Sequence, residues 1–331
     1  MPLPPAWQRA WAGGVYPALQ TRLTTLTAAL PFAALDLGGA LIGLLVGWLM
    51  VQLARRRLRW RAALTGIALV VALSWIAFQV LWGWHYQAPT LESRFVRGTD
   101  IPAARATEVA THAVRRLNTL HANAHERPWP GPFDRPEQLA ASMRAVLHDL
   151  QVRWHPVLPA SRHTIVDVYF RRAGIDGMTN PFGLEVVLNG HLLDFERPSV
   201  LAHEWAHLAG FADESDASFV GWMAGVRAGG QQEYAAWLGV LPHLAGALAP
   251  DARAAVLGGL DDGPVRDQRA IAARAAERWP AVQQVAWRVY DRFLKANRVG
   301  EGIARYDAVT LLLLTAADER TGRLRQSVTA P

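Results

Sequence analysis

The chain contains no cysteine and a single lysine, Lys295. Without thiols it can form neither disulfides nor cysteine-based metal sites, so any metal site must use histidine and carboxylate side chains. The formal charge of +6 is carried almost wholly by arginine. These arginines form no compact basic patch with interleaved aromatic residues, and the sequence therefore predicts no nucleic-acid partner.

The N-terminal segment, residues 1–30, lacks the features of a cleaved signal peptide. It has few charges, and no basic start is followed by an apolar core and a small-residue cleavage site. Trp7, Trp11 and Tyr16 are residue types suited to the headgroup level of a membrane. We expect an interfacial segment that leads into the membrane.

Two uncharged, apolar runs follow, Leu37–Ala54 and Ala62–Trp84. Each is long enough to span a bilayer if its flanks contribute, and the arginine-rich run Arg55–Arg61 between them can only be a hairpin loop. By the positive-inside rule this loop faces the cytoplasm, so the N-terminus and the rest of the chain lie on the opposite side. Residues 31–86 are therefore predicted to form a two-helix transmembrane hairpin. Its outer end carries a predicted aromatic belt of Trp82, Trp84 and Tyr86.

The remaining chain is predicted to be an extracytoplasmic domain, residues 87–319, followed by a flexible tail, residues 320–331. Alternating runs at His163–Phe170 and Phe182–Asn189 predict two strands of a small sheet. Apolar periodicity predicts helices over 103–126, 136–152, 200–208, 216–226, 233–249, 251–257, 266–297 and 306–318. Four aromatic residues near the C-terminus are predicted to pack in the core: Trp279, Trp287, Tyr290 and Phe293.

His121 and His125 lie four residues apart on the first predicted helix of this domain. That spacing allows two imidazoles to meet on one helix face. No acid stands between them in the position that a hydrolytic metal site would need. We therefore predict that they are surface residues, with a second metal site as the alternative.

One stretch, Val200–Phe219, carries a pattern with chemical meaning. His203 and His207 are four residues apart, so on a helix both imidazoles lie on one face and can bind one ion. Glu204 projects beside them, where it can reach a metal-bound water without binding the metal. This H-E-x-x-H pattern is typical of zinc hydrolases. It lies in an apolar run that we expect to be a buried helix with Ser199 as its N-cap.

Zinc in such a site needs a third protein ligand and an open fourth position for water. Three acids follow the pattern closely, Asp213, Glu214 and Asp216. Asp213 stands where metzincins have their third ligand, H-E-x-x-H-x-x-G-x-x-D, whereas Glu214 would approach from a second helix in the gluzincin manner. The two acids that do not bind metal would stabilise the start of that helix. Glu214 is the preferred ligand, and Asp213 and Asp216 remain alternatives.

Several stretches together resemble a known family. They are Gly177–Asn189, the H-E-x-x-H-x-x-G-F-A segment, Glu214–Phe219, Tyr290–Asn297 and Gly302–Tyr306. They look like a bacterial family of membrane-anchored proteins, carried as a domain of unknown function with a predicted zinc-peptidase site. The likeness runs from about Tyr16 to the C-terminal helix.

The resemblance bears on the choice of the third ligand. In that family the acid after the Gly-Phe-Ala is a glutamate at the position of Glu214, which favours it over Asp213. The run Glu214–Ala217 also resembles the E-x-x-A start of the ligand helix in membrane zinc peptidases of the CAAX-protease and heat-shock-protease type. Ser218 departs from the family, which usually has asparagine there, so a contact behind the metal ligands is expected to differ.

The resemblance implies an α+β fold: a mostly helical, zincin-like and gluzincin-like metallopeptidase domain with a small sheet, preceded by a two-helix transmembrane hairpin. It also implies a multi-pass protein embedded in the bacterial cytoplasmic membrane. The sequence does not indicate an oligomeric state.

We therefore expect a zinc-dependent metallopeptidase, with Zn²⁺ as cofactor and Glu204 as general base. Tyr306, Arg305 and His191 are candidates for a donor that stabilises the oxyanion. A peptide or protein substrate would lie extended against the strand at Phe182–Asn189. The alternatives are a non-catalytic, zinc-stabilised peptide-binding or scaffold protein of the cell envelope, and a zinc hydrolase acting on a non-peptide substrate such as cell-wall material.

Overall fold

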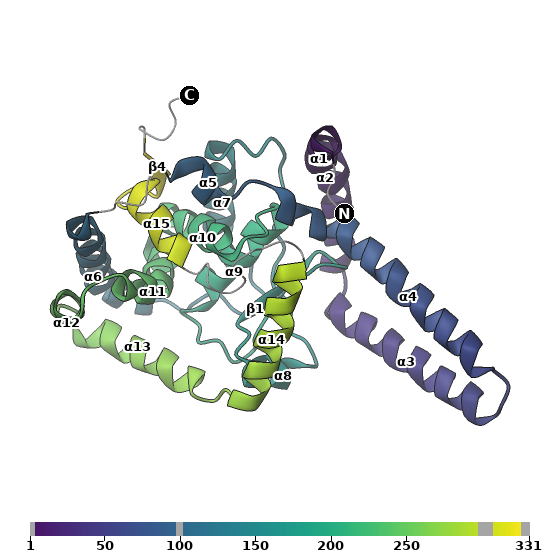
Figure 1. Cartoon of the computed structure of the whole chain (residues 1–331). Helices are drawn as coiled ribbons and strands as arrows, with labels where there is room; N and C mark the ends of the chain where they lie inside the picture. Colours follow the sequence, from purple (N-terminus) through teal and green to yellow (C-terminus); the bar gives the residue numbers. More distant parts are fainter. Residues whose placement is uncertain (1–3, 97–101, 297–306, 326–331) are drawn as a thin grey trace.

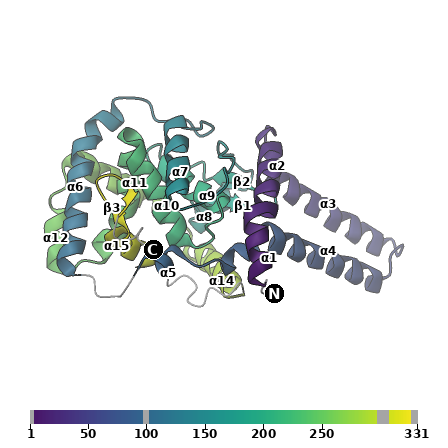
Figure 2. The ribbon, with the colours of Figure 1, turned by 90° about the horizontal axis from the view of Figure 1, so that it is seen from above.

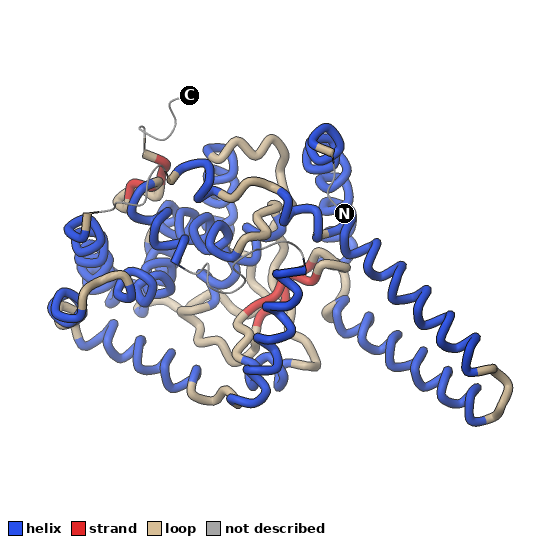
Figure 3. The backbone as a smooth tube through the Cα atoms, in the orientation of Figure 1, coloured by secondary structure: helices blue, strands red, loops and turns tan. Residues whose placement is uncertain are grey.

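The computed structural model describes residues 4–96, 102–296 and 307–325. Over these ranges the fold is mostly helical, with two small two-stranded sheets (Figure 3). Two helices near the N-terminus, α3 (Ala34–Ala54) and α4 (Trp60–Leu81), are long and apolar enough to cross a membrane. The coarse prediction of a helical protein with a small sheet and an apolar helical hairpin is confirmed.

The hairpin of α3 and α4 projects away from the remaining helices, as Figures 1 and 2 show from two directions. Its large apolar side chains are exposed along both helices, among them Leu44, Trp48, Leu69 and Ile76. A contiguous apolar surface of this size is unusual on a protein that is surrounded by water, and it suits a lipid environment.

The N-terminal helices α1 (Pro5–Ala10), η1 (Trp11–Val15) and α2 (Tyr16–Ala28) precede the hairpin. Trp11 and Tyr16 are only 5% and 0% exposed and belong to the main hydrophobic core. The prediction that they lie at headgroup level is therefore wrong, whereas Trp7 is exposed. Figure 2 shows α2 between the hairpin and the other helices. The domain boundaries predicted at residues 30 and 86 remain predictions.

The base of the hairpin is fixed to a strand of the larger sheet. The Glu185 carboxylate accepts hydrogen bonds from the backbone N–H groups of Ala34, at 2.8 Å, and Leu35, at 2.7 Å. These N–H groups belong to the first turn of α3 and have no partner within the helix. Asn180 donates to the same carboxylate at 2.9 Å. The hairpin is thereby anchored to the sheet by polar contacts.

The larger sheet consists of β1 (Gly177–Asn180) and β2 (Glu185–Leu188), which pair antiparallel with Gly177 opposite Leu188. The strand predicted at 182–189 is confirmed over 185–188. The strand predicted at 163–170 is wrong, because this segment turns and enters the helix α8 (Asp167–Ala173). The Asp36 carboxylate of α3 accepts a hydrogen bond from the Ile165 N–H at 3.1 Å and so stabilises the turn against the alternating pattern.

Most of the core lies between helices that surround α10 (Glu214–Ala228). This helix is buried on nearly all sides and packs against its neighbours α7 (Glu137–Asp149), α9 (Arg197–Leu208), α11 (Gly230–Gly246) and α15 (Asp307–Thr315). The largest fully buried side chains are Trp222 of α10 itself, Trp205 of α9 and Trp237 of α11. Behind α11 lies α6 (Ala103–His125), and α12 (Pro250–Leu257) packs against both. A helix buried all round, such as α10, is a rigid platform for a site.

The C-terminal part differs from its prediction in three ways. The single helix expected over 266–297 is two helices, α13 (Asp262–Ala275) and α14 (Pro280–Ala296), because Pro280 can start a helix but cannot continue one. Trp279 and Trp287 are about half exposed rather than in the core, at 53% and 50%. The tail predicted from residue 320 is ordered to residue 325, where β3 (Ala317–Asp318) pairs with β4 (Arg323–Leu324).

The backbones of α9 and α10 approach each other closely at Gly221. A Cβ atom on this glycine would lie 2.9 Å from the backbone nitrogen of His203, which is closer than such atoms pack. The small residue therefore lets the two helices touch through their backbones. The distance between these helices determines how far the side chains of α9 are from those at the start of α10.

Gly221→Ala is expected to push α10 away from α9 and to destabilise the fold by about 1–3 kcal/mol, the usual cost of overpacking. Gly246→Ala is the matched control, because nothing lies within 4 Å of a Cβ atom at that helical position. Its effect should stay below about 1 kcal/mol. Urea unfolding of the detergent-solubilised chain measures both. Equal stability of the two variants would contradict the close backbone contact.

Candidate metal centre

The helix that carries the two histidines, α9, begins earlier than predicted. Its N-cap is Glu196 rather than Ser199, and Pro198 lies in its first turn, where the missing N–H is not needed. It ends at Leu208 and is followed by Gly210, which adopts a φ of 104°, while the Phe211 N–H donates back to the Ala206 carbonyl at 3.1 Å. This left-handed turn reverses the chain directly after His207 and leads it toward α10.

Both imidazole rings are held from behind through Nδ1. His207 Nδ1 lies 2.6 Å from the Phe211 carbonyl oxygen, and His203 Nδ1 lies 3.1 Å from the Ser218 hydroxyl. A carbonyl can only accept, so His207 Nδ1 donates and its Nε2 keeps a lone pair when the ring is neutral. Metal-binding histidines are usually oriented by such a contact.

Glu214 completes the cluster. Its Oε2 atom lies 3.1 Å from His203 Nε2 and 3.6 Å from His207 Nε2. The three candidate ligand atoms all lie within 4.8 Å of one another. The structure thus brings together His203, His207 and Glu214, the three residues predicted from the sequence to share one ion.

The other two acids have structural contacts instead. Asp213 is the N-cap of α10 and accepts hydrogen bonds from the N–H groups of Ser215 and Asp216. The carboxylate of Asp216 accepts the Leu91 N–H, at 2.9 and 3.0 Å, from the short helix α5 (Leu91–Phe95). Glu214 alone among the three acids is directed at the imidazoles.

The charges in the cluster are strongly coupled. Burial alone would lower the pKa of His207, but the Glu214 carboxylate raises it to about 9. Burial would also raise the pKa of Glu214, yet His207 and His203 hold it well below its usual value. The Glu214 carboxylate is therefore ionised, and the two imidazoles beside it can bind the same cation as the carboxylate. Two imidazole nitrogens and one carboxylate oxygen form a donor set that suits zinc.

Glu204 lies beside this cluster and outside its ligand set. Its carboxylate is 4% exposed and accepts a hydrogen bond from the Thr179 hydroxyl of β1 at 2.8 Å. Burial raises the pKa of Glu204, although His207 and His203 oppose the shift. A buried carboxylate with a raised pKa is better matched to moving protons near neutral pH than an exposed one.

The segment directly after the second apolar helix also reaches the cluster. It forms the short helix η2 (Gly83–Gln87), preceded by Trp82, whose ring centroid lies 5.7 Å from that of His207. Trp82 is 6% exposed, so its assignment to an outer aromatic belt is wrong. Burial raises the pKa of Tyr86, and the nearby carboxylates of Glu214 and Asp213 raise it further. The phenol is therefore neutral and close to the cluster.

His85 is a third histidine near the cluster, and sequence analysis did not find it. Its ring packs edge-on against Trp11 and Tyr16, with centroids 4.5 and 4.1 Å apart. Burial, with a further contribution from His207, lowers the pKa of His85 to about 3, so the ring is neutral. The run Trp82–Tyr86 is rich in aromatic and imidazole groups. Its position after an apolar span nevertheless suggested a lipid interface.

The remaining predicted site residues are not part of this cluster. Tyr306 and Arg305 lie outside the described residues. His191 is an exposed residue whose Nε2 is 3.6 Å from Asp167. None of the donors predicted for an oxyanion is therefore found beside the cluster in the part of the chain that the structure describes.

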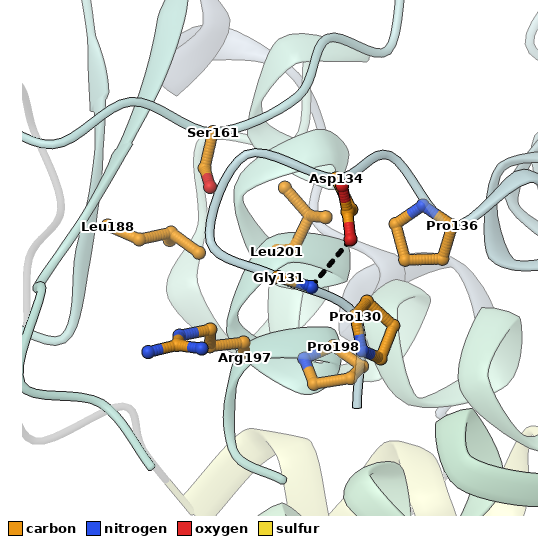
Figure 4. A pocket seen from close by; sticks show the side chains of 9 residues that line it. All are labelled: Pro130, Gly131, Asp134, Pro136, Ser161, Leu188, Arg197, Pro198 and Leu201. Atoms are coloured by element: carbon orange, nitrogen blue, oxygen red, sulfur yellow. Dashed lines mark hydrogen bonds between the residues drawn. The ribbon is translucent and has the colours of Figure 1, made fainter. Parts of the chain in front are cut away.

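A small pocket lies at the N-terminal end of α9, away from the histidines (Figure 4). It is lined by nine residues: Pro130, Gly131, Asp134, Pro136, Ser161, Leu188, Arg197, Pro198 and Leu201. The Gly131 N–H donates to the Asp134 carboxylate at 2.7 Å within it. None of the cluster side chains lines this pocket, so it is not a substrate site for the cluster.

Fold and site together define a mostly helical protein with an apolar helical hairpin and a partly buried cluster of two histidines and a glutamate. The chain belongs to the family described as protein of unknown function DUF3810, whose model matches residues 11–314. The match spans the hairpin and the cluster, and it confirms the predicted membership of a family of unknown function. No curated protein and no solved structure matches the chain.

Ser218→Ala is expected to remove the hydrogen bond behind His203 and to weaken zinc binding at the cluster by about 10–100-fold. Ser218→Asn, which restores the residue usual in the resembling family, should recover most of the affinity because an amide can also hydrogen-bond Nδ1. Competition with a chromophoric chelator measures the affinity. Thr119→Ala, which removes a surface hydroxyl bonded only to its own helix, should change nothing. An unchanged affinity in Ser218→Ala would contradict the orienting role.

Proposed function

We propose that this protein is a membrane-anchored, zinc-dependent metallopeptidase with a zincin-like, gluzincin-type site. The convergence of His203 Nε2, His207 Nε2 and Glu214 Oε2 within 4.8 Å carries the proposal. A cluster of this composition beside a buried, non-ligating Glu204 has the parts of a hydrolytic centre. When bound, zinc would supply Lewis-acid polarisation of a carbonyl and acidification of a water molecule.

Glu204 performs the proton transfers in this proposal. Its raised pKa lets the carboxylate accept a proton from the attacking water and then donate it to the leaving amine. Thr179 holds the carboxylate through one oxygen. The peptide bond that breaks is the C–N bond of the substrate, and the oxygen of water ends in the new carboxyl group.

The substrate would bind along β1 rather than β2. All four residues of β2 are buried, and its outer edge is bonded to Arg162, whose N–H donates to the Val186 carbonyl at 2.8 Å. The prediction that β2 is the free edge is therefore wrong. β1 pairs with β2 on one side only. An extended peptide added to the other side of β1 would run past Thr179 and Glu204.

The site would face the membrane surface on the extracytoplasmic side. Trp82 contacts His207 and follows α4 directly, so the cluster lies where the apolar hairpin meets the other helices. The arginines of Arg55–Arg61 at the far end of the hairpin favour a cytoplasmic loop. This arrangement favours peptide segments close to the bilayer as substrates.

Tyr86 replaces Tyr306 as the candidate donor to the oxyanion. The phenol is neutral and lies near Glu214. Its oxygen accepts the indole N–H of Trp82 at 3.3 Å, and the Trp82 ring in turn packs against His207. A donor of this kind interacts more strongly with the transition state than with the substrate.

Glu204→Gln is expected to lower turnover by roughly 10²–10⁴-fold while zinc content and fold remain, because glutamine keeps the shape but cannot take a proton. Cleavage of a peptide library by the full chain, read by mass spectrometry, measures turnover. The control is Glu108→Gln, which changes an exposed carboxylate on α6. A cellular role that survives Glu204→Gln would favour the non-catalytic scaffold instead.

Tyr86→Phe is expected to lower kcat by about 10²–10³-fold with little change in KM, the pattern for a donor used in the transition state. Tyr169→Phe removes an exposed hydroxyl on α8 and should leave both constants unchanged. The same steady-state assay measures both variants. A rise in KM alone, with kcat preserved, would count against this role for Tyr86.

A further inference from the structure

A second cluster of metal-ligating side chains joins two helices, α6 and α13, and includes no residue of the first cluster. His121 and His125 lie on α6, and Asp267 lies on α13. Asp267 Oδ2 is 2.8 Å from His125 Nε2 and 3.6 Å from His121 Nε2. The three candidate ligand atoms lie within 4.8 Å of one another. His125 is exposed, as expected, whereas His121 is half-buried.

The cluster combines a buried carboxylate with two imidazoles that are more exposed. Asp267 is 7% exposed and also accepts the hydroxyl of the buried Tyr234, on α11, at 2.5 Å. His121 is pressed against the first turn of α13, where a Cβ on Gly263 would lie 2.5 Å from its ring. The His125 ring is bordered by Trp129, at a centroid distance of 5.6 Å. The two imidazoles therefore have little freedom to turn away from the carboxylate.

The buried carboxylate of Asp267 needs a cation. No arginine lies within ion-pair distance of it among the residues that the structure describes. Its partners are two imidazoles and a phenol, all of which can be neutral. Burying an ionised carboxylate without a compensating charge is costly. A divalent ion between Asp267 and the two Nε2 atoms would supply that charge.

We propose that His121, His125 and Asp267 form a second zinc site, separate from the first, that fastens α13 to α6. The donor set of two imidazoles and one carboxylate is one that zinc prefers, with water in the fourth position. The sequence between the two histidines, Ala-Asn-Ala, contains no acid. The site therefore lacks the glutamate that follows the first histidine in the hydrolytic pattern, and we assign the ion a fastening role.

A fastening role fits the weak packing of α13. This helix buries only Gly263, Pro264 and Asp267, so apolar contacts contribute little to its attachment. Its other end is held by Arg274, which pairs with Asp176 at 2.9 Å and Glu196 at 2.7 Å. In Figures 1 and 2, α6 and α12 lie at the end of the domain opposite the hairpin. Without the ion, the start of α13 would be free to open.

The test counts zinc in the detergent-solubilised full chain. Replacing both His203 and His207 by alanine removes the first site, so zinc should fall from about two ions to about one per chain, one ion for each three-residue site. Adding Asp267→Asn to that variant should remove the remaining ion. His148→Ala, on a side chain that is 89% exposed, is the matched control and should change nothing.

A second measurement uses the wild-type chain and so does not depend on variant folding. Trypsin cleavage at the exposed Arg266 and Arg269 in α13 is compared after chelation and after adding back zinc. At zinc 100-fold above its dissociation constant, cleavage should be roughly 100-fold slower. The protection should persist when His203 and His207 are replaced and vanish in His125→Ala.

Zinc-independent cleavage, or a folded variant lacking His203 and His207 that holds no zinc, would overturn the proposal. The cluster would then be a hydrogen-bonded group only. Because these readouts use metal content and proteolysis, they do not depend on peptidase activity. Loss of turnover in Glu204→Gln and loss of zinc in His125→Ala test the two sites independently.

Discussion

The structure around the first site depends on the contact between α9 and α10. Their backbones touch at Gly221, opposite the N–H of His203. The left-handed turn at Gly210 reverses the chain after α9. Glu214, at the start of α10, therefore lies beside the imidazoles that α9 carries. A buried imidazole and two half-buried polar groups would be unfavourable as isolated groups, and their convergence gives each one a partner. The site is thus a consequence of how two apolar helices pack.

The N-terminal region is part of this arrangement rather than a simple anchor. The Tyr16 hydroxyl donates to the Leu208 carbonyl at the end of α9, at 3.0 Å. Glu185 of β2 caps the first turn of α3, and Trp82 after α4 packs on His207. At the base of the hairpin, the start of α3 therefore contacts β2, which packs against α9, and the residue after α4 contacts the candidate ligand His207 directly. A change in the hairpin would reach the site through short, packed contacts.

Local patterns predicted the parts of the site that depend on local geometry. The spacing of His203 and His207 is a property of one helix, and the apolar hairpin follows from length and composition. Contacts between distant segments were not predictable. Asp267 is 142 residues from His125, and the Asp216 that could have competed for metal is bonded to Leu91, 125 residues away. The alternating run at 163–170 misled for the same reason, since Asp36 stabilises a turn there.

The most direct measurement for the first site is zinc K-edge X-ray absorption of the zinc-loaded chain carrying His125→Ala, in which only the cluster of α9 and α10 can bind. Two imidazole nitrogens and oxygen ligands at about 2.0–2.2 Å are expected around the ion. The imidazole signal should halve when His207 is also replaced by alanine. A shell of oxygen atoms alone, unchanged by that replacement, would contradict a zinc centre held by His203, His207 and Glu214.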